Sequence, residues 1–97
     1  ILLSDHMVYS FEIKPGLIDK IRKIKKKNKT LFQRIQKKIQ EIIENPNHYK
    51  PLSYDMKNIK SVHLDPFVIT FSVNEKAKLV EFLEIDHHDK IYRRKSS

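Results

Sequence analysis

Three histidines in the second half of the chain are the best candidates for chemistry. His63 ends a β-branched stretch, and His87 and His88 close the last apolar segment. Imidazole side chains ordinarily titrate near neutral pH, so two that converge can supply both a base and an acid. In RNA cleavage, one imidazole takes the proton of a ribose 2′-OH and the other protonates the departing 5′-oxygen. A nearby cation then stabilises the charge that develops at phosphorus.

The residue types exclude or disfavour several other chemistries. The chain has no cysteine, so thiol nucleophiles, disulfide scaffolds and cysteine-based zinc sites are excluded. No HxH or HExxH spacing occurs, and we therefore expect neither a metal nor another cofactor. The conceivable ligands would be His63, His88, Asp65 and Asp86. A single histidine at a strand end is most often an ordinary surface residue, and this alternative stays open.

Apolar periodicity in the first half predicts a strand and a helical hairpin. A strand is expected from Met7 to Lys14, followed by a turn at Pro15-Gly16. Spacings of three and four then predict two amphipathic helices. The first apolar stripe comprises Leu17, Ile18, Ile21 and Ile24, and the second comprises Leu31, Phe32, Ile35, Ile39, Ile42 and Ile43. Thr30 and Gln33 have the spacing of a capping box, and Asn45-Pro46 ends the second helix.

The second half predicts a long loop and a three-stranded meander. The loop extends from Asn45 to Asn58, and strands are expected over Ile59–Leu64, Phe67–Val73 and Lys78–Ile85. The last strand is apolar on both faces, which indicates an interior position in the sheet. The predicted fold is α+β, with the helical hairpin packed on one face of a small, mostly antiparallel four-stranded sheet and the other face open. A single domain over residues 7–97 is expected, after a cloning remnant at residues 1–6.

The predicted hairpin carries most of the positive charge. The formal net charge of the chain is +8, and ten basic against three acidic residues between Leu17 and Glu44 give that segment +7. Such a face attracts a phosphate backbone through counterion release, or an acidic protein through the same field. A merely solvated helix surface is the alternative. With no cysteine, no secretion signal and no apolar run near the roughly 18 residues that span a bilayer, we expect a cytoplasmic protein.

Four segments in order resemble the RelE/ParE superfamily of toxins from type II toxin–antitoxin systems, and in particular the YafQ-like branch. They are Asn45-Pro46, Tyr49-Lys50-Pro51-Leu52, the run from Val62 to Phe67, and the run from Ile85 to Tyr92. The resemblance implies a ribosome-dependent mRNA interferase, which is a metal-independent endoribonuclease. It also implies a RelE-like fold. Many members carry an arginine where this chain has Val68.

The resemblance assigns roles position by position. It implies His63 as base, His88 as acid or phosphate ligand, and Lys50 as the cation near phosphorus. Asp65 and Tyr92 complete the implied catalytic set. The implied RNA-binding residues are Lys23, Lys25, Lys26, Lys27, Lys57, Lys60 and Phe67.

Partners and the main alternative follow from the same resemblance. It implies a ribosome and mRNA as targets, and an acidic antitoxin that forms a heterodimer or a 2:2 heterotetramer with the toxin. No membrane partner is expected. ParE-like members act on DNA gyrase without this histidine set, so a non-catalytic gyrase toxin is the alternative. A degenerate toxin that acts only through antitoxin binding is a further one.

Overall fold

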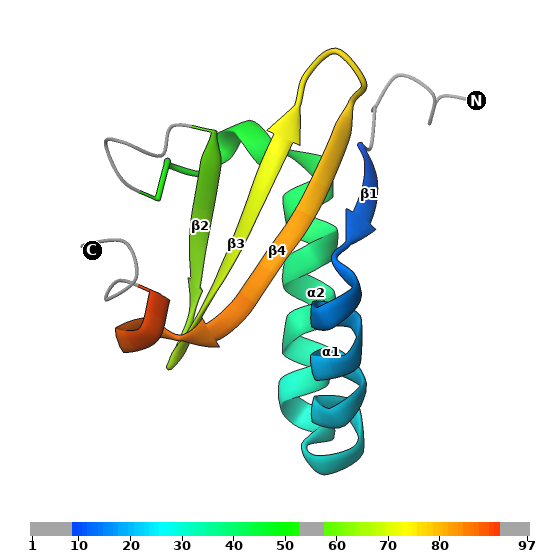
Figure 1. The fold of residues 1–97 in the computed structure, drawn as a ribbon, viewed down its shortest axis with the longest axis vertical. Helices are drawn as coiled ribbons and strands as arrows, with labels where there is room; N and C mark the ends of the chain where they lie inside the picture. The colour runs from blue at the N-terminus through cyan, green and yellow to red at the C-terminus, as the bar shows by residue number, and fades with distance from the viewer. Residues whose placement is uncertain (1–8, 53–57, 92–97) are drawn as a thin grey trace.

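The computed structural model describes residues 9–52 and 58–91, so Tyr92, Lys57 and residues 1–6 lie outside the described residues. The elements are β1 (Ser10–Ile13), α1 (Pro15–Lys27), α2 (Lys29–Glu44), the short 3-10 helix η2 (Pro46–His48), β2 (Ile59–Leu64), β3 (Phe67–Asn74) and β4 (Leu79–His87). A helical turn over residues 88–91 follows β4 directly. Figure 1 shows these elements along the chain.

The strands form one mixed sheet in the order β1-β4-β3-β2. β2, β3 and β4 pair as an antiparallel meander. β1 pairs in parallel with the first half of β4, from Ser10 opposite Leu79 to Ile13 opposite Phe82. The prediction that the last strand lies inside the sheet is therefore confirmed, because β4 has a neighbour on both sides (Figure 1).

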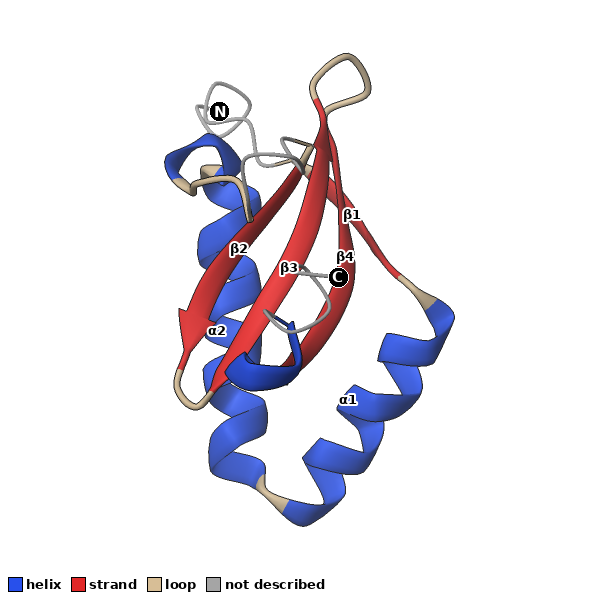
Figure 2. Cartoon of the chain, turned by 60° about the vertical axis from the view of Figure 1, so that its left-hand side comes forward, coloured by secondary structure: helices blue, strands red, loops and turns tan. Residues whose placement is uncertain are grey.

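Both helices pack on one face of this sheet and bury the main core there. α1 lies against β4, and α2 lies against β2 (Figure 2). The core combines both layers and contains Leu17, Ile35, Ile42, Ile43, Leu64, Ile69, Phe71, Val80, Phe82 and Ile85. The predicted α+β class and helical hairpin are thus confirmed. Neither helix in the described ranges has the length and apolar character needed to cross a bilayer.

Two local predictions in the hairpin are wrong. Pro15-Gly16 does not form a separate turn but opens α1, because proline fits the first helical position, where no intrahelical N–H bond is lost. The cap of α2 is Asn28 rather than Thr30: the Asn28 side chain accepts a hydrogen bond of 3.0 Å from the Leu31 amide. Asparagine one position before the helix competes well as an N-cap, so the helix starts earlier than the capping box indicates.

The sheet face opposite the helices is less open than predicted. Val68 and Thr70 of β3 are only 0% and 3% exposed. A second small cluster covers this face, in which Val68 packs with Leu52 and Ile91. Leu52 and the helical turn after β4 thus pack over the sheet. On α1, Ile18 departs from its predicted stripe and is 37% exposed.

Candidate active site at the ends of β2 and β4

His63 and His88 lie together on the sheet face opposite the helices. His63 is paired across the sheet with Val68, which is buried on that face, whereas the neighbouring Leu64 belongs to the helix-side core. The imidazole rings of His63 and His88 stack with centroids 5.4 Å apart and planes inclined by 29°. Both side chains are exposed. The meander therefore brings together the two histidines that the sequence selected.

A change of backbone direction after β4 places His88 on that face. β4 ends at His87, whose ring packs against Phe67 at 5.2 Å between centroids. The chain then enters the helical turn, and the His88 amide donates to the Pro66 carbonyl over 3.1 Å. That carbonyl belongs to the β2–β3 turn just beyond His63. Of the two adjacent histidines, His88 therefore contacts His63, while His87 contacts an aromatic side chain of β3.

Lys50 lies beside His63 along the edge of β2. The Lys50 carbonyl accepts from the Ser61 amide over 3.2 Å, and the Leu52 amide donates to the Ile59 carbonyl over 2.7 Å. This pairing forms one wall of a groove of about 400 Å³. The residues that line it are His48, Tyr49, Lys50, Pro51, Ser61, Val62 and His63. The loop thus brings a cation and a histidine to the same groove.

Tyr49 anchors the segment that carries Lys50. Its ring packs edge-on against Phe71 of the core at 5.8 Å. Burial raises the pKa of the Tyr49 phenol above its usual value, partly offset by Lys38, so the side chain is neutral in the physiological range. The Lys60 ammonium donates to the Tyr49 carbonyl over 3.1 Å. Lys60, which was predicted to bind RNA, thus contacts the backbone of the segment that carries Lys50.

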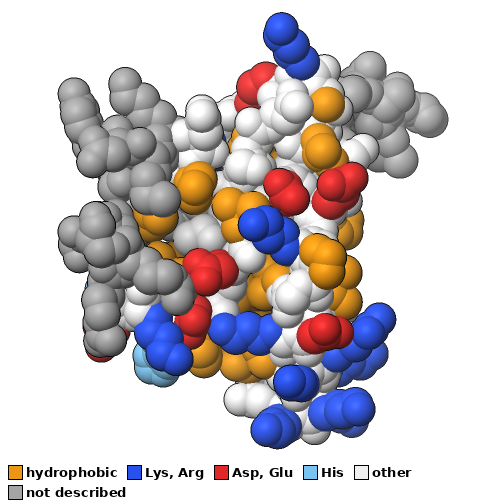
Figure 3. Space-filling model, viewed as in Figure 1, with side chains coloured by type: hydrophobic (Ala, Val, Ile, Leu, Met, Phe, Trp, Pro, Cys, Tyr) orange, Lys and Arg blue, Asp and Glu red, His pale blue; other side chains and the backbone are white. Residues whose placement is uncertain are grey.

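The other predicted site residues are distributed around this centre. Asp65 is exposed in the β2–β3 turn, and Phe67 is half-buried against the helix-side core. The predicted RNA-binding lysines of α1 are exposed toward its C-terminal end; they are Lys23, Lys25, Lys26 and Lys27. Figure 3 shows Lys and Arg side chains gathered at the hairpin end of the molecule. Tyr92 and Lys57 belong to the segments outside the described residues.

Lys20 and Arg34 were not predicted from the sequence, and Asp86 was considered there only as a conceivable metal ligand. Asp86 accepts from the His87 amide over 2.8 Å and lies 3.5 Å from the Lys20 ammonium. Burial raises the pKa of the Asp86 carboxyl, but the His87 amide together with Lys20 and Lys90 outweighs burial, so the pKa lies below its usual value. Arg34 of α2 donates to the Asp65 carbonyl over 3.3 Å. No sequence signal distinguishes Lys20 and Arg34 from the many other basic residues of the hairpin.

The arrangement offers Lys50 and the His63 imidazole along one groove, and the His88 imidazole is stacked on His63. Two imidazoles and a cation are the groups that phosphodiester transesterification requires. The groove lies at an edge strand, so an extended chain can approach it without displacing a core element.

Comparison with known proteins identifies the family. Residues 11–92 match the family model described as the ParE toxin of the type II toxin–antitoxin system parDE. The chain belongs to the ParE toxin family. This toxin is 43% identical over 89 residues to the putative toxin RelE4 of Methanocaldococcus jannaschii, which covers 91% of the chain and 95% of the relative. It is also 43% identical over 86 residues to an uncharacterized protein of Methanosarcina mazei, covering 88% of the chain and all of that relative.

Solved structures share the fold of the toxin at low sequence identity. The isolated RelE toxin of Escherichia coli has a TM-score of 0.68 and 16% identity, covering 91% of this chain and 95% of that one. The RelE–RelB complex of Pyrococcus horikoshii has a TM-score of 0.64 and 14% identity, covering 84% of this chain and 96% of that one. The RelBE2 toxin–antitoxin complex of Mycobacterium tuberculosis has a TM-score of 0.70 and 13% identity, covering 84% of this chain and 100% of that one. The predicted RelE-like fold and membership of the RelE/ParE superfamily are therefore confirmed.

Proposed function

We propose that this toxin is a metal-independent endoribonuclease of the YafQ-like type, which cleaves mRNA in the ribosomal A site and so blocks translation. The observation that carries the proposal is the stacked pair of His63 and His88, with ring centroids 5.4 Å apart. Both side chains are exposed rather than buried in a core, so a substrate can reach them.

Each group has a defined part in the proposed cleavage. His63 takes the proton of the 2′-OH, and His88 protonates the departing 5′-oxygen. Lys50, across the groove from β2, stabilises the additional negative charge on phosphorus. The lysines of α1 bind ribosomal RNA phosphates and hold the toxin in place, without reading the sequence. Asp65, Phe67 and Tyr92 are proposed to assist by contacting the substrate.

Primer extension on mRNA from a translating extract tests this function. The purified wild-type chain should create new mRNA 5′ ends, while His63→Ala and His88→Ala should create none. His87→Ala is the matched control, because it removes a neighbouring imidazole whose ring packs on Phe67 instead. It should retain most of the cleavage. New ends with all three variants would exclude the histidine mechanism, and no ends with wild type would exclude the nuclease.

A gyrase-directed toxin is the second candidate, because the matching family model is that of ParE. In that case, the wild-type chain would inhibit DNA supercoiling by purified gyrase and would leave mRNA intact. His63→Ala and His88→Ala would inhibit gyrase as well as wild type does. The two assays run in parallel on the same proteins distinguish the candidates.

We also propose an acidic antitoxin as the partner in the cell. The hairpin segment between Leu17 and Glu44 carries a net +7, which suits an acidic chain. One structural neighbour is described as a toxin–antitoxin complex, and another is described as a RelE–RelB complex. Light scattering of the purified complex should give the mass of a heterodimer or of a 2:2 heterotetramer. An antitoxin that binds equally well at high salt would contradict the electrostatic part of this proposal.

A further inference from the structure

α1 contacts the segment that leads into His88. The Lys20 ammonium lies 3.5 Å from Asp86 Oδ2, and the Asp86 side chain is only 17% exposed. The other carboxylate oxygen of Asp86 accepts from the His87 amide over 2.8 Å. One carboxylate thus joins α1 to the backbone at the point where β4 turns into the helical turn. His88 is the next residue along the chain.

α2 contacts the segment that follows His63. The Arg34 guanidinium donates to the Asp65 carbonyl over 3.3 Å. The neighbouring Pro66 carbonyl accepts from the His88 amide over 3.1 Å. The β2–β3 turn is therefore held from one side by α2 and from the other by the segment that carries the second histidine.

We propose that Lys20 and Arg34 are positioning residues, which set the placement of His88 and His63 through Asp86 and the Asp65 carbonyl. The inference rests on the proposed nuclease function for its catalytic consequence, but the geometric part stands on the contacts alone. The basic hairpin then has two roles. Its exposed lysines bind anions, and these two side chains hold the histidine segments at a fixed spacing.

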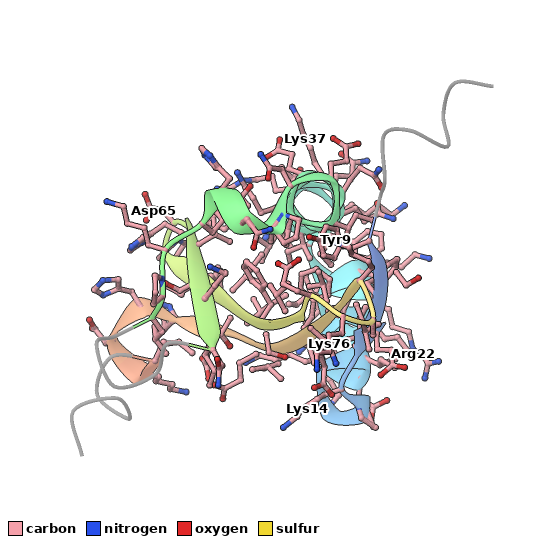
Figure 4. All side chains as sticks on the ribbon, turned by 90° about the horizontal axis from the view of Figure 1, so that it is seen from above. Tyr9, Lys14, Arg22, Lys37, Asp65 and Lys76 are labelled. Carbon is pink, nitrogen blue, oxygen red and sulfur yellow. The ribbon has the colours of Figure 1, made fainter. Side chains whose placement is uncertain are left out.

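Two cations of the same hairpin provide matched controls. Arg22 of α1 pairs with Asp19 at 3.7 Å and its side chain is 73% exposed, whereas that of Lys20 is 42% exposed. Lys37 is an exposed residue of α2. Figure 4 shows the Arg22 and Lys37 side chains directed away from the sheet. Replacing either one removes the same charge from the same helix without touching a histidine segment.

The first test measures the ring geometry without any cleavage. In wild type, NMR should show a nuclear Overhauser effect between ring protons of His63 and His88. Lys20→Gln and Arg34→Gln should weaken or abolish it, while Arg22→Gln and Lys37→Gln should leave it intact. Lys20→Arg keeps the charge and should retain the effect, which separates loss of the contact from loss of folding.

The second test measures cleavage on programmed ribosomes. Lys20→Gln and Arg34→Gln should lower kcat at least about tenfold with KM nearly unchanged, because misplaced groups lose rate and not binding. The double variant Lys20→Gln with Asp86→Asn should be no worse than either single variant, since both break one contact. Additive losses would contradict the pairing.

The outcomes separate the inference from the function on which it rests. A ring contact that persists in Lys20→Gln and Arg34→Gln overturns the positioning role, and so does equal loss in the two control variants. Absence of the ring contact in wild type overturns it as well. If wild type shows the contact and the controls behave as expected but no RNA is cut, the nuclease proposal fails and the geometric inference stands.

Discussion

The stacked rings of His63 and His88 join the end of β2 to the turn after β4, across the sheet face that the helices leave uncovered. The contact forms because β2 and β4 run in the same direction in the meander, so both strands finish at the same end of the sheet. A hydrogen bond from the His88 amide to the Pro66 carbonyl fixes the two segments to each other. The site thus depends on long-range pairing and not on a local motif.

Replacement of Lys50 should affect the chemical step more than binding. Lys50→Ala should lower kcat by about 10²–10³, the usual effect of removing one group that stabilises transition-state charge. Lys50→Arg should retain much of the rate, since it keeps a cation in the groove. Lys76→Ala serves as the control, because Lys76 lies in the β3–β4 turn and does not line the groove that contains Lys50. Single-turnover cleavage measures all three, and an unchanged rate for Lys50→Ala would remove Lys50 from the mechanism.

The N-cap of α2 should contribute measurably to the free energy of unfolding. Asn28→Ala removes the side-chain acceptor of the Leu31 amide and should lower the free energy of unfolding by about 1 kcal/mol. Thr30→Ala should have little effect or stabilise slightly, because Thr30 lies inside the helix and alanine is the better helix former. Denaturant unfolding of both variants checks this. A larger loss of stability in Thr30→Ala than in Asn28→Ala would instead support the predicted capping box of Thr30 and Gln33.

The Asp86 contacts should make the toxin sensitive to acid. The pKa of the folded-state carboxyl lies below its ordinary value of 3.8. Its contribution to stability is therefore complete above that value and is lost as the pH falls through the lower folded-state pKa. The stability difference between wild type and Asp86→Asn should be largest near neutrality and should shrink in acid. Unfolding in urea at several pH values measures it, and a difference that grows in acid would contradict a lowered pKa for Asp86.

The exposed lysines of α1 should determine the salt dependence of RNA binding. Replacing Lys25, Lys26 and Lys27 with glutamine should reduce the slope of log affinity against log salt concentration by about two to three, if each contacts one phosphate. Lys76→Gln should leave the slope unchanged. Filter binding to ribosomal RNA fragments gives these slopes. Equal slopes for wild type and the triple variant would show that the hairpin end does not bind phosphate.

Much of the fold could be predicted because its signals are local. Strands were expected over Ile59–Leu64 and Phe67–Val73; β2 has the expected residues, and β3 extends one residue further, to Asn74. The helices were expected from their apolar spacing, although the start of each was placed too late: α1 begins at Pro15, which was expected in a turn, and Asn28 rather than Thr30 caps α2. Such errors arise because several polar or turn-forming residues near a helix end can each act as its cap or first residue. Only the packing of the helix selects one of them.

The histidine pair could be suspected from the sequence but not located. Adjacent residues of a strand point to opposite faces, so at most one of His87 and His88 can meet His63, but this rule does not say which one. That choice depends on where β4 stops and on the Pro66 carbonyl that captures the His88 amide. The roles of Lys20 and Arg34 could not be predicted at all, because charge composition carries no information about which lysine or arginine reaches a given carboxylate or carbonyl.

The central claim is that His63 and His88 cleave RNA by using the ribose 2′-OH as nucleophile. The most direct test is cleavage of an mRNA on programmed ribosomes, compared with the same mRNA carrying a single 2′-deoxy nucleotide at the scissile position. We expect cleavage of the first and none of the second, with a 5′-OH on the downstream product and no cleavage by His63→Ala. Cleavage of the deoxy substrate, or an intact all-ribose mRNA with wild-type toxin, would contradict the claim.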